Sequence, residues 1–90
     1  MFHLNLGNLQ DQAGQKEEAL KSYLKALELD PKSVNTHYNL GLLFIEMGRL
    51  NEAKQAFSEA LKLEPGDGDI QKQMDDVMKK ISVLTPAPPR

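Results

Sequence analysis

The sequence predicts an all-α fold in which one helical hairpin occurs twice and a single further helix follows. Two observations carry this prediction. Apolar residues recur at three- and four-residue spacing through most of the 90-residue chain, and no segment shows the alternation typical of a strand. A shift of 34 residues also aligns residues 1–31 with residues 35–65, and 12 of the 31 aligned pairs are identical. Because a single hairpin cannot bury its apolar face alone, we expect the two repeats to stack.

Glycine and proline divide each repeat into two helices. Gly14 and Gly48 follow the first apolar pattern of each repeat, where a glycine commonly ends a helix. Pro31 and Pro65 end the second pattern, because proline lacks a backbone N–H and disfavours helix at the preceding residue. The predicted repeats are residues 1–33, with helices at about 1–13 and 15–29, and residues 34–67, with helices at about 34–47 and 50–63.

Residues 68–84 are predicted to form a capping helix. Its apolar residues form a narrow stripe among charges of both signs, which favours a cap over a basic, membrane-surface helix. Met74-Asp75 stands where each repeat has Leu-Gly. Residues 85–90, TPAPPR, are predicted to be a proline-rich disordered tail, and we read its PxxP pattern as part of a linker rather than as an SH3 ligand.

Composition excludes several functional classes. Eleven basic against 13 acidic residues leave no excess positive charge to attract nucleic acid. Without cysteine there is no disulfide, thiolate metal site or cysteine nucleophile. The longest apolar run, Leu42–Ile45, is far shorter than a membrane span, and the N-terminus shows no signal-peptide pattern. We therefore expect a cytoplasmic protein that binds neither nucleic acid nor membrane.

The aligned positions resemble the tetratricopeptide repeat (TPR) family. The residues that carry the resemblance are Leu6, Gly7, Ala19, Tyr23, Ala26 and Pro31 in the first repeat, and Leu40, Gly41, Phe44, Ala53, Phe57, Ala60 and Pro65 in the second. The chain departs from the pattern at His3 and His37, where the family usually has an aromatic residue, and at Gln10, the counterpart of Phe44. The resemblance implies a fragment of a right-handed α-solenoid that acts as a protein–protein interaction module. It also implies that this module is part of a larger TPR array.

No group of residues indicates catalysis or metal binding. A zinc site needs three or four converging ligands, but each repeat offers one histidine, His3 or His37, with no third ligand at a regular offset. We expect both histidines to be partly buried between the helices of their hairpins. Gly66 and Gly68 lack the Lys-Ser/Thr of a phosphate-binding loop, and no Ser/His/Asp grouping recurs. The sequence therefore predicts a non-enzymatic protein without cofactor or metal.

The resemblance implies a concave groove, lined by the first helix of each repeat, that holds a peptide or a segment of a partner protein. Carried over by repeat offset, its residues are Leu4, Asn8, Asp11, Asn35, Tyr38, Asn39, Leu42 and Ile45. We expect Tyr38, Leu42 and Ile45 to be apolar anchors and the three asparagines to bind the backbone of the ligand. A clamp for the acidic tails of chaperones is disfavoured, because Leu4 replaces its lysine and Asp69 stands where a later basic residue belongs.

A second surface is predicted at the front of the first repeat. Thr36, Leu40, Leu43 and Met47 should pack against the first hairpin, and the same offset gives a self-association face of Phe2, Leu6, Leu9 and Ala13. Either further repeats precede this face or another molecule covers it, and a symmetric homodimer is the simplest cover. An alternative function is therefore a dimerisation segment of a longer repeat protein that has no peptide ligand of its own.

Overall fold

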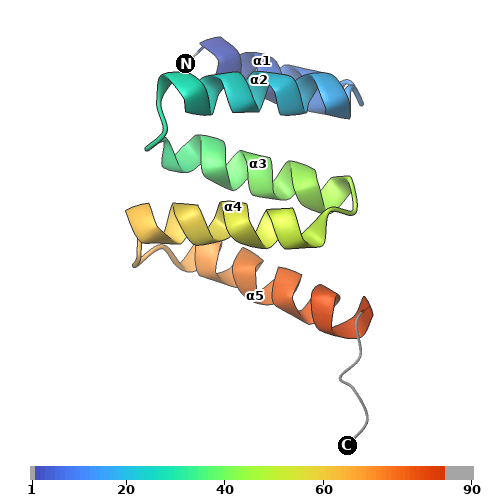
Figure 1. Cartoon of the computed structure of the whole chain (residues 1–90), viewed down its shortest axis with the longest axis vertical. Helices are drawn as coiled ribbons and strands as arrows, with labels where there is room; N and C mark the ends of the chain where they lie inside the picture. Colours follow the sequence, from blue (N-terminus) through green and yellow to red (C-terminus); the bar gives the residue numbers. More distant parts are fainter. Residues whose placement is uncertain (1, 85–90) are drawn as a thin grey trace, which may run out of the picture.

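The computed structural model describes residues 2–84, which form five helices and no strand. The helices stack along one axis, with α1 and α2 at one end, α3 in the middle, and α4 and α5 at the other end (Figure 1). The all-α prediction is confirmed, and the helix bounds differ from the expected ranges by at most one residue. The predicted tail, residues 85–90, lies outside the described residues. The helices are α1 (Phe2–Gln12), α2 (Lys16–Leu29), α3 (Val34–Glu46), α4 (Leu50–Leu63) and α5 (Gly68–Leu84).

Glycines end α1 and α3 in the same way. Gly14 has a φ of 80° and Gly48 a φ of 76°, a left-handed conformation that side chains disfavour. In each turn the next N–H reaches back to a carbonyl in the last turn of the helix, from Gln15 to Gln10 at 2.8 Å and from Arg49 to Phe44 at 2.8 Å. These turns reverse the chain, so that each repeat becomes an antiparallel hairpin.

Side chains cap the N-terminal ends of α3 and α5. The Ser33 hydroxyl accepts a hydrogen bond from the N–H of Thr36 at 3.2 Å. The Asp67 carboxylate accepts from the N–H groups of Asp69 and Ile70 at 2.9 and 3.2 Å. Both contacts satisfy donors that the first turn of a helix leaves unpaired. They fix where the first turns of α3 and α5 lie, next to each other on one side of the stack.

The glycines of the Leu-Gly pairs allow close contact within each hairpin. A Cβ on Gly7 would lie 2.6 Å from the Tyr23 ring, and one on Gly41 would lie 2.6 Å from the Phe57 ring. Each aromatic ring therefore occupies a notch in the opposing helix. On α5, the corresponding residue is Asp75, which is exposed and accepts a hydrogen bond from Gln71. A further helix with an aromatic ring could not pack there in the same way.

The core runs through the whole stack. Between the hairpins, α3 buries Thr36, Leu40 and Leu43, and α2 packs on this helix. At the far end, α5 packs on α4 and buries Ile70 and Val77. This continuous core holds α1, α3 and α5 in fixed relative positions, which is the requirement for a binding surface that spans several helices.

Candidate functional site

Asn8 on α1 and Asn39 on α3 meet where the two hairpins adjoin. The side-chain oxygen of Asn8 accepts hydrogen bonds from the Tyr23 hydroxyl at 2.5 Å and from the Asn39 amide at 3.2 Å. Within residues 2–84, this arrangement leaves the Asn8 amide N–H₂ and the Asn39 amide oxygen without a protein partner. Both side chains are half-buried. The pair therefore presents a donor and an acceptor that are held in place by the fold.

Tyr23 supplies the polar link between the helices. It occupies the place that Phe57 has in the second repeat, so its hydroxyl is an addition that only the first hairpin carries. Burial, together with the smaller effect of the negative charges of Asp11 and Glu46, raises the pKa of Tyr23 to about 12. The hydroxyl is consequently neutral at physiological pH and remains a donor to Asn8.

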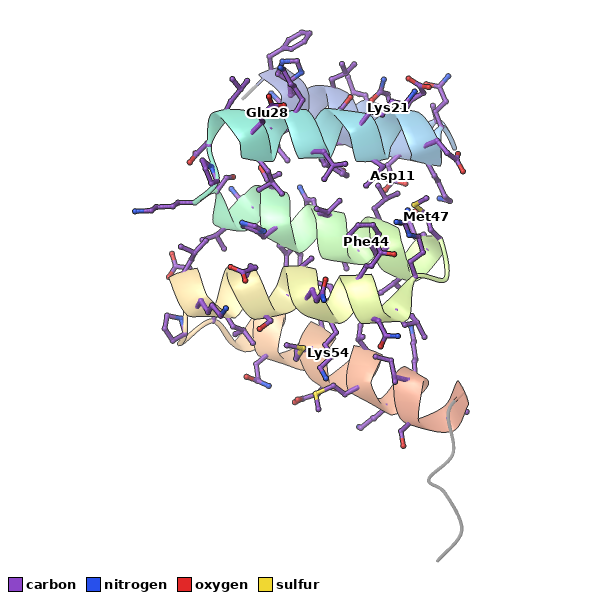
Figure 2. All side chains as sticks on the ribbon, in the orientation of Figure 1. Asp11, Lys21, Glu28, Phe44, Met47 and Lys54 are labelled. Carbon is purple, nitrogen blue, oxygen red and sulfur yellow. The ribbon has the colours of Figure 1, made fainter. Side chains whose placement is uncertain are left out.

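A lysine joins the two hairpins at the C-terminal ends of α1 and α3. The Lys16 ammonium lies 2.6 Å from Glu46 and 3.5 Å from Asp11. The hydrogen bond to Glu46 raises the pKa of Lys16 and outweighs the opposite effect of desolvation. Figure 2 shows Asp11 on the same side of the stack as Phe44 and Met47, toward the right of the view. The two carboxylates carry one more charge than the lysine neutralises, so this end of the surface is weakly acidic.

The apolar part of the surface belongs to α3. Tyr38, Leu42 and Ile45 are half-buried and pack against the core, so each keeps part of its side chain exposed. The Tyr38 ring contacts the Phe57 ring edge-on, with 5.7 Å between the centroids. This contact with a buried ring fixes the orientation of Tyr38 from the core side.

A small pocket lies between the first turns of α3 and α5. Its volume is about 210 Å³, and its lining includes Asn35, Tyr38, Asp67 and Asp69. Two carboxylates therefore stand beside an aromatic ring at the end of the surface opposite Lys16. One carboxylate, Asp67, is already used to cap α5.

Sequence comparisons identify the repeat. The model of the TPR repeat matches residues 7–48, and the model of the tetratricopeptide repeat matches residues 34–67. The chain belongs to the TPR family. TPR domains are protein–protein interaction modules built on a fold that is generally non-catalytic. No match was found among curated proteins.

Solved TPR structures have the same arrangement of helices. MamA is 20% identical with a TM-score of 0.86, over 90% of this chain and 47% of its own. YrrB, described as a TPR protein with an unusual peptide-binding site, is 31% identical with a TM-score of 0.82. The match covers 89% of this chain and 41% of YrrB. The Sgt2 TPR domain from Aspergillus fumigatus is 22% identical with a TM-score of 0.83. The match covers 99% of this chain and 62% of the Sgt2 domain. The chain thus spans about half the length of the TPR structures it matches.

One residue predicted for the TPR groove lies elsewhere. Leu4 is only 5% exposed and belongs to the core of the first hairpin, so it offers almost no surface to a ligand. Asn35 is exposed, and the other six predicted groove residues are half-buried. Sequence reasoning missed Tyr23 and Lys16, although the exchange of phenylalanine for tyrosine at a repeat offset was a usable signal for the first.

The two histidines at the TPR aromatic position have different neighbours. His37 is half-buried, and its Nε2 lies 2.8 Å from the Pro31 carbonyl oxygen, so it ties α3 to the loop that precedes it. His3 is also half-buried and meets the ring of Phe2 edge-on at 5.1 Å. Within residues 2–84, no three His, Asp or Glu side chains are grouped so that they could hold a metal ion. None of the helices in this range is long and apolar enough to cross a membrane.

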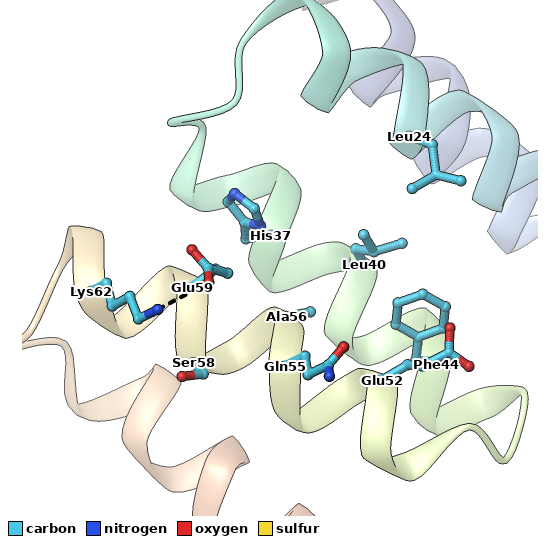
Figure 3. Close-up of a pocket in the computed structure, with 10 residues that line it drawn as sticks. All are labelled: Leu24, His37, Leu40, Phe44, Glu52, Gln55, Ala56, Ser58, Glu59 and Lys62. Carbon is cyan, nitrogen blue, oxygen red and sulfur yellow. Dashed lines mark hydrogen bonds and ion pairs between the residues drawn. The ribbon is translucent and has the colours of Figure 1, made fainter.

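A larger pocket lies away from the groove, between α2 and the second TPR hairpin. Its volume is about 490 Å³, and Figure 3 shows Leu24 of α2 facing Leu40 and Phe44 of α3 across it. The charged residues at its rim are paired within the second hairpin, Glu59 with Lys62 at 3.2 Å and Glu52 with Arg49 at 2.6 Å. The rim therefore offers no unpaired charge that would select a ligand.

The front of the TPR stack exposes a set of apolar side chains. Phe2 is 71% exposed and Leu9 is 63% exposed. Leu6 is half-buried and Ala13 is exposed. The corresponding residues of α3 lie under α2, and three of them, Thr36, Leu40 and Leu43, are buried. The first repeat thus exposes to solvent the apolar stripe that is largely buried in the second repeat.

Proposed function

We propose that this TPR module is non-catalytic and binds an extended segment of a partner protein along the surface formed by α1, α3 and α5. The observation that carries the proposal is the pairing of Asn8 and Asn39, which leaves one amide donor and one amide oxygen acceptor open to solvent. A peptide unit offers the complementary acceptor and donor. Recognition of this kind reads the backbone of the ligand rather than its sequence.

The half-buried side chains of α3 would supply the selectivity. Tyr38, Leu42 and Ile45 present apolar surface beside the asparagine pair. Burying one large apolar side chain of a ligand there would contribute about 1.5–3 kcal/mol. We therefore expect the partner segment to carry leucine-, isoleucine- or phenylalanine-like anchors.

The charges at the two ends disfavour an acidic ligand. Lys16 is already paired with Glu46 and Asp11, so it is not free to hold a terminal carboxylate. Asp67 and Asp69 stand at the other end. An acidic tail would therefore meet negative charge at both ends, whereas a neutral or basic segment would not. The description of YrrB, which is 31% identical, as a peptide-binding TPR protein supports a peptide ligand for this fold.

The test is to select peptides from a displayed random library against the whole chain and to measure their affinities by calorimetry. Asn39→Ala should weaken binding about tenfold, since it removes a backbone contact worth about 1–1.5 kcal/mol. Asn51→Ala, at an exposed asparagine on α4, is the matched control and should bind as the unaltered chain does.

A second pair of variants tests the apolar anchors. Leu42→Ala should weaken the selected peptides, whereas Leu24→Ala, in the pocket on the other side of the stack, should not. Thermal melts of each variant show whether the fold is retained. If no peptide is selected, or if Leu24→Ala and Asn51→Ala are as damaging as the groove variants, the proposed groove is wrong. The first result would favour a chain that only self-associates.

A further inference from the structure

A stripe of exposed apolar side chains on α1 forms a second candidate interaction surface, separate from the groove. It consists of Phe2, Leu6 and Leu9 on α1 and Ala13 in the turn that follows, called the front stripe here, and Phe2 and Leu9 are 71% and 63% exposed. Burial of such surface drives association in water. We propose that the front stripe pairs two copies of this chain, with the two α1 helices antiparallel across a two-fold axis.

The charge of α1 fits a self-pairing surface. Asp11 is its only acidic or basic residue apart from His3, and Lys16 holds it on the groove side. By contrast, α2 and α5 each carry six charged residues. The helix at the front of the stack therefore has the charge content of the internal helix α3, which carries only Glu46. Two copies can approach through α1 without bringing like charges together.

The spacing of the front stripe is the same when read in either direction. Its members are four, three and four residues apart, so an antiparallel partner helix presents the same pattern in reverse. Phe2 then faces Ala13 of the partner subunit, and Leu6 faces Leu9 of the partner subunit. The largest side chain thus meets the smallest, which is the condition for even packing between two helices. A symmetric interface of this type requires such self-complementarity.

The front stripe does not reproduce the contact between the hairpins. Phe2 stands where α3 has Thr36, a smaller residue that is buried and hydrogen-bonded to Ser33. A phenylalanine would not fit the space that Thr36 occupies beneath α2. The difference favours an occupant shaped to receive an aromatic ring over a helix packed as α2 packs on α3.

The remaining apolar surface near α1 enlarges the interface. Leu29, at the end of α2, is 66% exposed and lines a pocket of about 420 Å³ together with Phe2, Leu4 and Ala26. A helix of 11 residues is only roughly 16 Å long. Because two such helices bury less than the 1,200 Å² or so of a standard interface, we expect a reversible, concentration-dependent dimer. The groove side chains Asn8 and Asp11 lie on another face of α1 and stay accessible.

Light scattering coupled to size exclusion, over a concentration series of the whole chain, measures the association. The mass should rise from 10.1 kDa toward twice that value as the concentration increases. Leu9→Glu should raise the dissociation constant at least tenfold, while its circular dichroism stays unchanged because Leu9 is exposed. The matched control is Val83→Glu, since Val83 is 79% exposed on α5; its dissociation constant should equal that of the unaltered chain.

Cysteine cross-linking tests the direction of the helices, and the chain has no native cysteine to interfere. An oxidised mixture of Phe2→Cys and Ala13→Cys chains should yield disulfide-linked heterodimers, whereas neither variant alone should cross-link. In the antiparallel pair, two copies of the same position lie about 16 Å apart, beyond the reach of a disulfide. Cross-linking of Phe2→Cys with itself would overturn the antiparallel arrangement. A mass that stays at one chain up to high micromolar concentration, unchanged by Leu9→Glu, would overturn the dimer and indicate that another protein covers the stripe.

Discussion

Leu9 and Leu43 occupy the same place in the two repeats, but Leu9 is 63% exposed whereas Leu43 is fully buried. The helices that carry them share the Leu-Gly pair, the glycine turn and the aromatic ring packed into the glycine notch. The difference lies in the neighbour, since α2 covers α3 and no described helix covers the front of α1. The repeat thus encodes the hairpin, while the position in the stack decides which surfaces are exposed.

The largest effect should come from truncating the buried leucine. Leu43→Ala removes a fully buried side chain and leaves a cavity between the hairpins, so it should lower the free energy of unfolding by about 2–5 kcal/mol. Leu9→Ala, at the same offset, should change it by less than about 1 kcal/mol in dilute solution. Urea denaturation followed by circular dichroism measures both. Similar losses for the two variants would mean that Leu9 is covered even in the monomer, contrary to the structure.

The next effect concerns a feature that the repeats share. Gly41→Ala and Gly7→Ala each place a methyl group 2.6 Å from a ring carbon of Phe57 or Tyr23. The rings are buried and cannot move freely, so each variant should lose about 1–3 kcal/mol of unfolding free energy, despite the better helix propensity of alanine. Gly66→Ala is the control, because nothing lies within 4 Å of its added Cβ.

The outcome separates two explanations of the Leu-Gly pair. If both glycines allow close helix contact, the two variants are destabilised in chemical denaturation and Gly66→Ala is within about 0.5 kcal/mol of the unaltered chain. If the alanine variants are more stable instead, helix propensity outweighs the ring contact and the notch has no packing role.

The parts of the structure that follow from local chemistry were predictable. Glycine in a left-handed turn and proline after a helix act within a few residues, so the C-terminal ends of α1 to α4 could be placed from the sequence. The repeat offset also identified the stripe of α1 that no described helix covers, because the equivalent residues of α3 had to face the first hairpin.

The site was only partly predictable, because it depends on the distances between helices. Leu4 and Tyr38 share an offset, yet the leucine is buried in the hairpin core and the tyrosine keeps an exposed part. The contact of Lys16 with Glu46 joins residues 30 positions apart. The bonds from Tyr23 and Asn39 to one oxygen of Asn8 need three helices in register. Periodicity assigns a residue to a face, but it does not give these distances.

The smallest effect at neutral pH should come from the single aromatic hydroxyl that distinguishes the hairpins. Tyr23→Phe gives the first repeat the ring of the second and removes the hydrogen bond to Asn8. It should lower the free energy of unfolding by about 0.5–1.5 kcal/mol near pH 7. A loss well above this range, measured by urea denaturation, would mean that the hydroxyl organises more of the fold than its one bond to Asn8.

The sign of this effect should reverse at high pH. Burial raises the pKa of Tyr23 to about 12 in the folded chain, against about 10 for an exposed tyrosine. The unfolded chain therefore loses the proton first, and the stabilisation by the neutral hydroxyl is complete below about pH 10 and lost as the pH rises toward 12. The two proteins differ in no other ionisable group, so the difference between the two stability curves isolates Tyr23. That difference should shrink above pH 10 and then favour the phenylalanine variant. Because the chain has two tyrosines, a Tyr38→Phe chain allows the phenolate absorbance of Tyr23 to be titrated alone, and a midpoint near 10 would show that its hydroxyl is open to water.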